Sequence, residues 1–96
     1  MQSKRYFVYI ATNSTNRVFY TGVTNNLVRR ISEHKKGFSE FTRRYNIKKL
    51  VYVEEYTDIK DALHREKQIK AGSRRKKFDL ITQNNPDFAD LFPNII

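Results

Sequence analysis

Residues 5–26 read RYFVYIATNSTNRVFYTGVTNN, and this stretch decides the fold. Two runs rich in Val, Ile, Phe, Tyr and Thr, residues 6–11 and 17–23, flank the polar segment 12–16. β-Branched and aromatic residues favour strands, whereas Asn, Ser and Thr favour turns. The stretch therefore predicts a β-hairpin.

A helix is expected directly after the hairpin. A polar residue at positions 24–26 can cap its start, Leu27 and Ile31 recur at helical spacing, and Gly37 can end it. The basic and aromatic stretch that follows, residues 38–49, predicts a helical turn and a loop.

The second half of the chain predicts one more strand and two more helices. Residues 50–56, LVYVEEY, have the composition of a strand, which we expect at the centre of the sheet. Asp58 can cap a helix that ends at Gly72, and Ser73 can cap another that runs to about Gln83. The order ββαβαα indicates an α/β (α+β) fold, a small three-stranded antiparallel sheet flanked by helices.

The length of 96 residues, of which 39% are hydrophobic, predicts one domain, residues 1–96, with a single core. Leu91 and Phe92 follow Phe88 by three and four positions, and this spacing predicts a terminal helical turn that covers the core. Cysteine is absent, which excludes disulfides and thiolate zinc sites. Because no signal peptide or membrane span is evident, we expect a cytoplasmic protein, associated with the nucleoid if the source is bacterial.

The charge of the chain favours a polyanionic partner. Nineteen Lys and Arg against ten Asp and Glu give a formal net charge of +9, which attracts nucleic acid. A membrane surface is not expected, because the sequence has no basic amphipathic helix with a broad apolar face.

Four consecutive cations fall in the first turn of the last predicted helix: Arg74, Arg75, Lys76 and Lys77. The helix dipole disfavours each cation there by about 0.3–1 kcal/mol, whereas free N–H groups at a helix start attract phosphate. The run therefore indicates an anion site, with a merely solvated charge run as the alternative.

Glu66 is the most informative single residue for chemistry. It shares one helical face with the apolar residues Ile59, Ala62, Leu63 and Ile69. Burial of an isolated carboxylate costs roughly several kcal/mol unless a cation or hydrogen bonds compensate it. A divalent metal is one such cation. An ion pair with Arg65, Lys67 or Lys70, or a position at the rim of the apolar face, is the alternative, and periodicity does not decide between them.

Arg30 and His34 are four residues apart, so they project from the same helical face, just beyond the strand that carries Tyr20 and Gly22. This spacing brings together a cation, an imidazole and a phenol. The alternative is a solvated basic helix, to which Arg29 also belongs.

Three aromatic residues, Phe38, Phe41 and Tyr45, interleave with the basic residues of the stretch 38–49. Aromatic rings among cations can stack on unpaired bases. Their spacing is nevertheless more typical of a core, and we expect Phe41 and Tyr45 in the core, while Phe38 stays open.

Several of these residues form one pattern: Tyr9 within Phe7-Val8-Tyr9-Ile10, Tyr20 eleven positions later within Tyr20-Thr21-Gly22, and then Arg30, His34 and Glu66. This pattern resembles the GIY-YIG nuclease superfamily. The segments REKQIK (65–70) and KKFDLI (76–81) resemble its small stand-alone YhbQ-like group. The chain departs from the pattern at Phe7, in the place of the first motif's glycine, and at Thr21, a β-branched residue that suits a strand.

The resemblance implies a metal-dependent endonuclease that hydrolyses DNA phosphodiester bonds, directed by DNA structure or ends, in processing of the repair or recombination type. It implies one Mg²⁺ or Mn²⁺ bound by Glu66, with water and phosphate oxygens as further ligands. The implied catalytic residues are Tyr9, Tyr20, Arg30, His34 and Glu66. The residues expected to contact nucleic acid are Gly22, Arg29, Lys70, Arg74, Arg75, Lys76 and Lys77.

In this scheme Arg30 stabilises charge on the phosphate oxygens, and Tyr9 or Tyr20 positions or deprotonates the attacking water. The choice between the two tyrosines stays open, and no role is transferred to Asn84 or Asn85. Two other functions stay open as well. One is a non-catalytic module that binds DNA or RNA, and the other is a nuclease subunit that cuts only beside a targeting protein partner.

Overall fold

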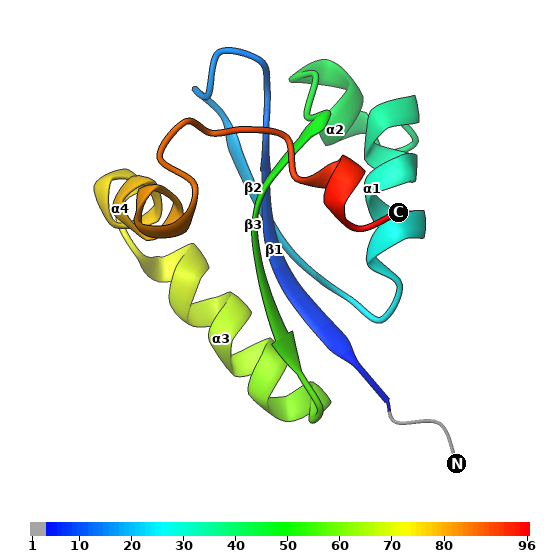
Figure 1. Ribbon diagram of the computed structural model, residues 1–96, viewed down its shortest axis with the longest axis vertical. Coiled ribbons are helices and arrows are strands. Elements are labelled where there is room, and N and C mark those ends of the chain that lie inside the picture. Colours follow the sequence, from blue (N-terminus) through cyan, green and yellow to red (C-terminus); the bar gives the residue numbers. More distant parts are fainter. Residues whose placement is uncertain (1–3) are drawn as a thin grey trace.

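The computed structural model describes residues 4–96 and shows a three-stranded sheet between two layers of helices (Figure 1). Strand β1 (Tyr6–Thr12) lies at the centre, and β2 (Phe19–Thr24) and β3 (Lys49–Tyr56) flank it, each antiparallel to it. The predicted hairpin, the three-stranded antiparallel sheet and the α+β fold are therefore confirmed.

The expected central position of residues 50–56 was wrong, because β3 is an edge strand. Its Leu50 and Val51 are both fully buried, yet they belong to hydrophobic clusters on opposite faces of the sheet. Helices cover both faces, so even an outer strand needs a continuous apolar sequence. Composition thus reports the burial of a strand's two faces, and not its position in the sheet.

Helices α3 (Ile59–Ala71) and α4 (Arg74–Asn84) cover one face of the sheet (Figure 1). The buried cluster on this face includes Val8, Ile10, Val51, Ala62, Ile69 and Ile81. Asp58 and Ser73 cap the two helices as predicted, since each side chain accepts a hydrogen bond from a backbone N–H of the first turn. None of the helices within residues 4–96 has the length and apolar character needed to cross a membrane.

Helices α1 (Leu27–Lys36) and α2 (Glu40–Arg44) cover the other face, together with the tail that includes the 3₁₀ turn η1 (Phe92–Asn94) (Figure 1). The side chain of Asn26 caps α1, and Gly37 ends it with a φ of 71°, in the left-handed region that favours glycine. Helix α2 is the helical turn predicted in the basic, aromatic stretch. The face that carries α1 is the face on which the candidate site lies.

The tail after α4 is tied to the sheet and to α1 by polar contacts. The Asp90 carboxylate accepts hydrogen bonds from the Leu50 N–H at 3.1 Å and from the Lys35 ammonium at 2.7 Å. The Leu91 N–H donates to the Leu50 carbonyl at 2.7 Å. The tail is therefore part of the folded domain.

The predicted helical turn over Phe88, Leu91 and Phe92 was wrong, because the terminal turn begins only at Phe92. Phe88 has a φ of 51° and packs in the cluster below α3 and α4, whereas Leu91 and Phe92 pack in the cluster below α1. The tail thus passes from one helix layer to the other beside β3. A continuous helix would keep all three side chains on one stripe and could not make that passage.

Candidate active site

The predicted site residues Tyr9 and Gly22 are register partners across β1 and β2. The Tyr9 ring lies so close over Gly22 that a Cβ at position 22 would stand 2.5 Å from the Tyr9 hydroxyl oxygen and 2.6 Å from its Cζ. The sequence predicted that the bare backbone of Gly22 contacts nucleic acid. In the structure the Tyr9 ring occupies that space.

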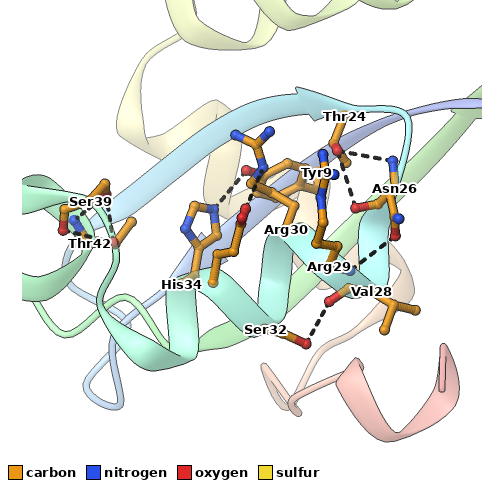
Figure 2. A network of polar contacts seen from close by, with 11 residues as sticks. Tyr9, Thr24, Asn26, Val28, Arg29, Arg30, Ser32, His34, Ser39 and Thr42 are labelled. Carbon is orange, nitrogen blue, oxygen red and sulfur yellow. Dashed lines mark hydrogen bonds and ion pairs between the residues drawn. The ribbon is translucent and has the colours of Figure 1, made fainter.

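His34, on α1, meets the Tyr9 hydroxyl. The hydroxyl oxygen lies 2.7 Å from His34 Nε2, and both side chains are buried (Figure 2). The Tyr20 ring lies 5.0 Å from the His34 ring and 6.2 Å from the Tyr9 ring, between centroids. The two phenols and the imidazole therefore form one cluster between β1, β2 and α1.

The electrostatic surroundings keep both partners of this contact neutral. Burial lowers the pKa of His34, and the Arg30 charge lowers it further, against the opposite effect of Glu33. Burial raises the pKa of Tyr9 well above its usual range; the neighbouring Tyr20 adds to this effect and Arg30 opposes it. At pH 7 Tyr9 is therefore a phenol that can donate to the free Nε2 lone pair of a neutral His34.

Arg30 lies between two surface hollows and keeps an unused N–H. Its Nε is 3.3 Å from Glu33 Oε1, but among residues 4–96 no acceptor lies in line with the N–H. One hollow, of about 180 Å³, is lined by Tyr20, Arg30, Glu33, His34, Phe38 and Ser39. The other, of about 250 Å³, is lined by Tyr6, Val23, Thr24, Asn25, Arg30 and Ile59. The second hollow extends from α1 to α3 beside the edge strand β2. The candidate site is therefore open to solvent along β2.

Glu66 is half-buried on α3, with a side chain 17% exposed. Its carboxylate lies 3.5 Å from Lys70 Nζ, and its charge is close enough to contribute to the raised pKa of Tyr9. Ile59 and Leu63 are 37% and 41% exposed, so the apolar stripe predicted on α3 is only partly buried. The structure thus shows Glu66 at the rim of the apolar stripe and paired with Lys70, in the helix layer opposite to α1.

The fit of a divalent metal depends on Glu66. Within residues 4–96 no group of three or more His, Cys, Asp or Glu side chains is placed to hold a metal ion. A carboxylate oxygen is nevertheless the donor that Mg²⁺ and Mn²⁺ prefer, and Mg²⁺ commonly keeps several waters and phosphate ligands. Lys70, the partner of Glu66, is 55% exposed and can swing away. The residues present therefore fit an ion held jointly by one carboxylate and the substrate.

The basic residues predicted to contact nucleic acid are not equivalent. The Arg74 guanidinium donates to the carbonyls of Arg17 and Asn16 and lies 5.0 Å from the Phe19 ring centroid, so it ties α4 to the hairpin loop. Arg75 pairs with Asp79 on the exposed face of α4 at 3.2 Å.

Arg29 and Lys70 are exposed, and Lys76 and Lys77 line a hollow of about 420 Å³ between α3 and α4. Lys70 pairs with Glu66, and the Lys77 ammonium lies 3.5 Å from the Lys70 carbonyl oxygen. The sequence did not separate Arg74 and Arg75 from Lys76 and Lys77, because four adjacent cations look alike in a charge run.

Three features of the structure were not predicted from the sequence. Phe41 and Tyr45 were expected in the core, but they are 42% and 37% exposed, and Phe38 is 69% exposed. Glu33 was not selected, although its spacing of three from Arg30 on one helix is the signal that could have found it. Asn85, for which no role was assigned, is buried and bonds the Val51 carbonyl and Ala89.

Comparison with known proteins agrees with this geometry. The GIY-YIG catalytic domain family matches residues 5–79, which include every residue of the cluster described above. A UPF0213 protein of Syntrophus aciditrophicus is 40% identical over 84 residues, covering 85% of this chain and 94% of that protein. A UPF0213 protein of Limosilactobacillus reuteri is 32% identical and covers 98% of this chain and 100% of that protein.

A solved structure is similar as well. The solution NMR structure of the UPF0213 protein BH0048 from Bacillus halodurans is 29% identical, covers 90% of this chain and 92% of that chain, and has a TM-score of 0.58. The family match, the relatives and the shared fold lead to one conclusion. The chain belongs to the GIY-YIG family, with a catalytic domain of the nuclease type that acts on nucleic acid.

Proposed function

We propose that the protein is a metal-dependent endonuclease that hydrolyses DNA phosphodiester bonds. The observation that carries this proposal is the contact between the Tyr9 hydroxyl and a neutral His34, which lines one hollow with Arg30. Hydrolysis needs a group that takes a proton from water and a cation that stabilises charge on the phosphate. The cluster contains both.

Proton transfer can run from water through Tyr9 to His34. The raised pKa of Tyr9 makes a free phenolate unavailable at neutral pH, so Tyr9 can accept a proton only while it gives up its own. His34 Nε2, at 2.7 Å, is the acceptor of that second proton. Tyr20, which lines the hollow with Arg30, then orients the attacking water.

Arg30 and Glu66 act on the phosphate. The Arg30 side chain is 37% exposed and lines both hollows, so its guanidinium can donate to a non-bridging oxygen as negative charge develops there. Glu66 would hold the divalent ion, which when bound supplies Lewis-acid polarisation of the phosphate. The exposed cations Arg29, Lys70, Lys76 and Lys77 would contact the backbone. Because such contacts do not read sequence, we infer that DNA structure or ends direct the enzyme, as in repair or recombination.

The test is a cleavage assay with Mg²⁺ or Mn²⁺ on flaps, forks, single strands and blunt duplex. We expect cleavage by the unmodified protein and a loss of about 10²- to 10⁴-fold for Tyr9→Phe and for His34→Gln. Glu66→Gln should abolish cleavage and retain DNA binding. The matched control is Glu55→Gln, which removes an exposed carboxylate paired with the exposed Arg5 and should leave the rate unchanged.

The Lys70–Glu66 ion pair favours a second candidate, a nucleic-acid-binding module without turnover. This alternative predicts that no substrate is cut at any metal concentration, and that Lys76→Glu with Lys77→Glu abolishes binding while Glu66→Gln changes nothing. A targeting protein partner would appear as cleavage only after its addition.

A further inference from the structure

Three exposed aromatic rings lie before, on and directly after α2, and we call Phe38, Phe41 and Tyr45 the α2 aromatic surface. Their exposed fractions are 69%, 42% and 37%. Burial of an aromatic side chain is among the largest favourable contributions to folding, so three neighbouring rings left in water indicate a binding surface.

The α2 aromatic surface continues directly from the candidate active site. The Phe41 ring centroid lies 5.8 Å from that of Tyr20 and 4.8 Å from that of Tyr45. Phe38 lines the same hollow as Tyr20, Arg30 and His34. A row of rings therefore leads outward from the residues proposed to cleave the phosphodiester bond.

Cations accompany these rings. The Lys36 Nζ lies 5.9 Å from the Phe38 ring centroid, and the Arg44 guanidinium lies 5.5 Å from that of Tyr45. Arg43 is exposed on the same short helix. A shallow hollow of about 260 Å³ is lined by Glu40, Phe41, Arg44 and Tyr45. Glu40 is the one carboxylate there, in the first helical turn, where the helix dipole stabilises it.

Rings among cations match the chemistry of one ligand class. Nucleobases stack on aromatic faces, and the phosphates between successive bases pair with Lys and Arg. In a duplex the faces of the bases are already stacked on one another. An aromatic surface can therefore engage only bases that are unpaired and turned outward.

We propose that the α2 aromatic surface is a stacking subsite for unpaired nucleobases of the DNA strand that is cut. This inference rests on the proposed function and gives it a substrate class. The strand enters with its bases on Phe38, Phe41 and Tyr45, and the adjoining phosphate reaches Arg30. Single-stranded segments next to the scissile bond are then preferred over continuous duplex.

The test measures binding without cleavage. Fluorescence anisotropy in EDTA compares a labelled single-stranded DNA with a blunt duplex of the same sequence, for the unmodified protein and for Phe38→Ala, Phe41→Leu and Tyr45→Leu. The matched control is Phe78→Leu: Phe78 is also 42% exposed and lies 5.1 Å from another ring, that of Phe88, but it stands on α4. Circular dichroism melting verifies that each variant folds.

We expect each of the three substitutions to weaken single-strand binding at least about fivefold, since stacking on one ring contributes about 1–3 kcal/mol per base. Duplex binding and the Phe78→Leu protein should be unchanged. A 2-aminopurine base in the single strand should lose fluorescence on binding to the unmodified protein and recover it with Phe41→Leu.

Equal losses for single strand and duplex, or no loss for Phe38→Ala and Tyr45→Leu, would overturn the subsite. Tighter binding of an RNA strand of the same sequence would overturn its assignment to DNA. Failure of the proposed function is recognised separately: aromatic-dependent single-strand binding without cleavage in Mg²⁺ or Mn²⁺ supports the subsite and contradicts the endonuclease. Phe38 is the most exposed of the three rings, so its variant keeps the test valid if the Phe41 variant unfolds.

Discussion

At the scale of single residues, Gly22 and Tyr9 couple the hairpin to the candidate site. Gly22 lies in an ordinary strand conformation, so its lack of a side chain is not required by its own backbone. It is required by the Tyr9 ring, which fills the space where a Cβ would be and thereby reaches His34. The same glycine thus serves packing and chemistry.

Gly22→Ala should therefore lower the free energy of unfolding by about 1–3 kcal/mol, as overpacking does. The direction of this change in the free energy of unfolding is informative, because replacing a strand glycine by alanine normally stabilises a protein by about 0.5–1 kcal/mol. Urea unfolding measures the change. In a Tyr9→Leu background, which removes the atoms in the way, the same substitution should cost far less. An equal cost in both backgrounds would show that the Tyr9 ring is not the cause.

The position of Glu66 shows what sequence can say about a residue. Its place on the helix after Asp58 was predicted, and so was an ion pair with a neighbouring lysine as one alternative. The spacing of apolar residues could not show how α3 is rotated on the sheet, and Ile59 and Leu63 proved to be partly exposed. That rotation depends on contacts of α3 with β1 and β2, which are distant in sequence.

At the scale of elements, one polar cluster fixes α3 against β3. The Glu54 carboxylate accepts hydrogen bonds from Arg65 Nε at 2.9 Å and Nη2 at 3.0 Å, and from the hydroxyls of Tyr52 and Tyr56. Burial alone would raise the pKa of Glu54, but these hydrogen bonds outweigh it and lower the pKa. Because Arg65 precedes Glu66, the cluster also sets the direction in which Glu66 points.

Arg65→Met should lower the free energy of unfolding by about 1–3 kcal/mol, since it leaves a half-buried carboxylate without its cation. Chemical denaturation provides the measurement. The matched control is Arg75→Met, which breaks the exposed pair with Asp79 and should change stability by less than about 0.5 kcal/mol. Similar losses from the two substitutions would contradict a special role for the Glu54 cluster.

A helix or strand could be predicted where its sequence signals lie in neighbouring residues. Helix caps at Asp58 and Ser73 and the glycine end of α1 depend on neighbouring residues and were confirmed. The edge position of β3 was not predictable from LVYVEEY, because burial on both faces looks the same at the edge and at the centre. The exposure of Phe41 and Tyr45 was likewise missed, since helical spacing of aromatics does not show whether another element covers them.

At the scale of the whole molecule, buried titratable groups define a pH range of stability. Burial raises the pKa of Tyr9 and Tyr56, and that of Tyr52 to about 12, so these phenols resist ionisation in the fold. Burial lowers the pKa of His34, which favours its neutral form. Hydrogen bonds, against burial, lower the pKa of Glu54 and Asp90.

The sign of each effect follows from linkage. Groups with a raised pKa stabilise the fold below their ordinary value, about 10 for tyrosine, and that stabilisation is lost as the pH rises further. Groups with a lowered pKa stabilise it above their ordinary value, and the loss begins below pH 6.5 for His34 and below about pH 4 for the carboxylates. Stability should therefore be greatest between about pH 7 and 10.

Urea unfolding from pH 3 to 11 measures this profile. His34→Gln should flatten the fall that begins below about pH 6.5, and Tyr9→Phe should reduce the fall above about pH 10. Tyr45→Phe is the control for the alkaline side, because its hydroxyl has no hydrogen bond among the described residues. An unchanged profile in the His34 variant would mean that other groups carry the acid sensitivity.

The tail beside β3 has a consequence for how separate molecules behave. An outer strand with free backbone groups invites a strand of another chain to join it, and this is a route to aggregation. At Leu50 both outward backbone groups are already taken, the N–H by Asp90 and the carbonyl by Leu91. The tail therefore shields this end of the sheet from intermolecular strand addition and helps a small, strongly cationic protein to remain monodisperse at high concentration.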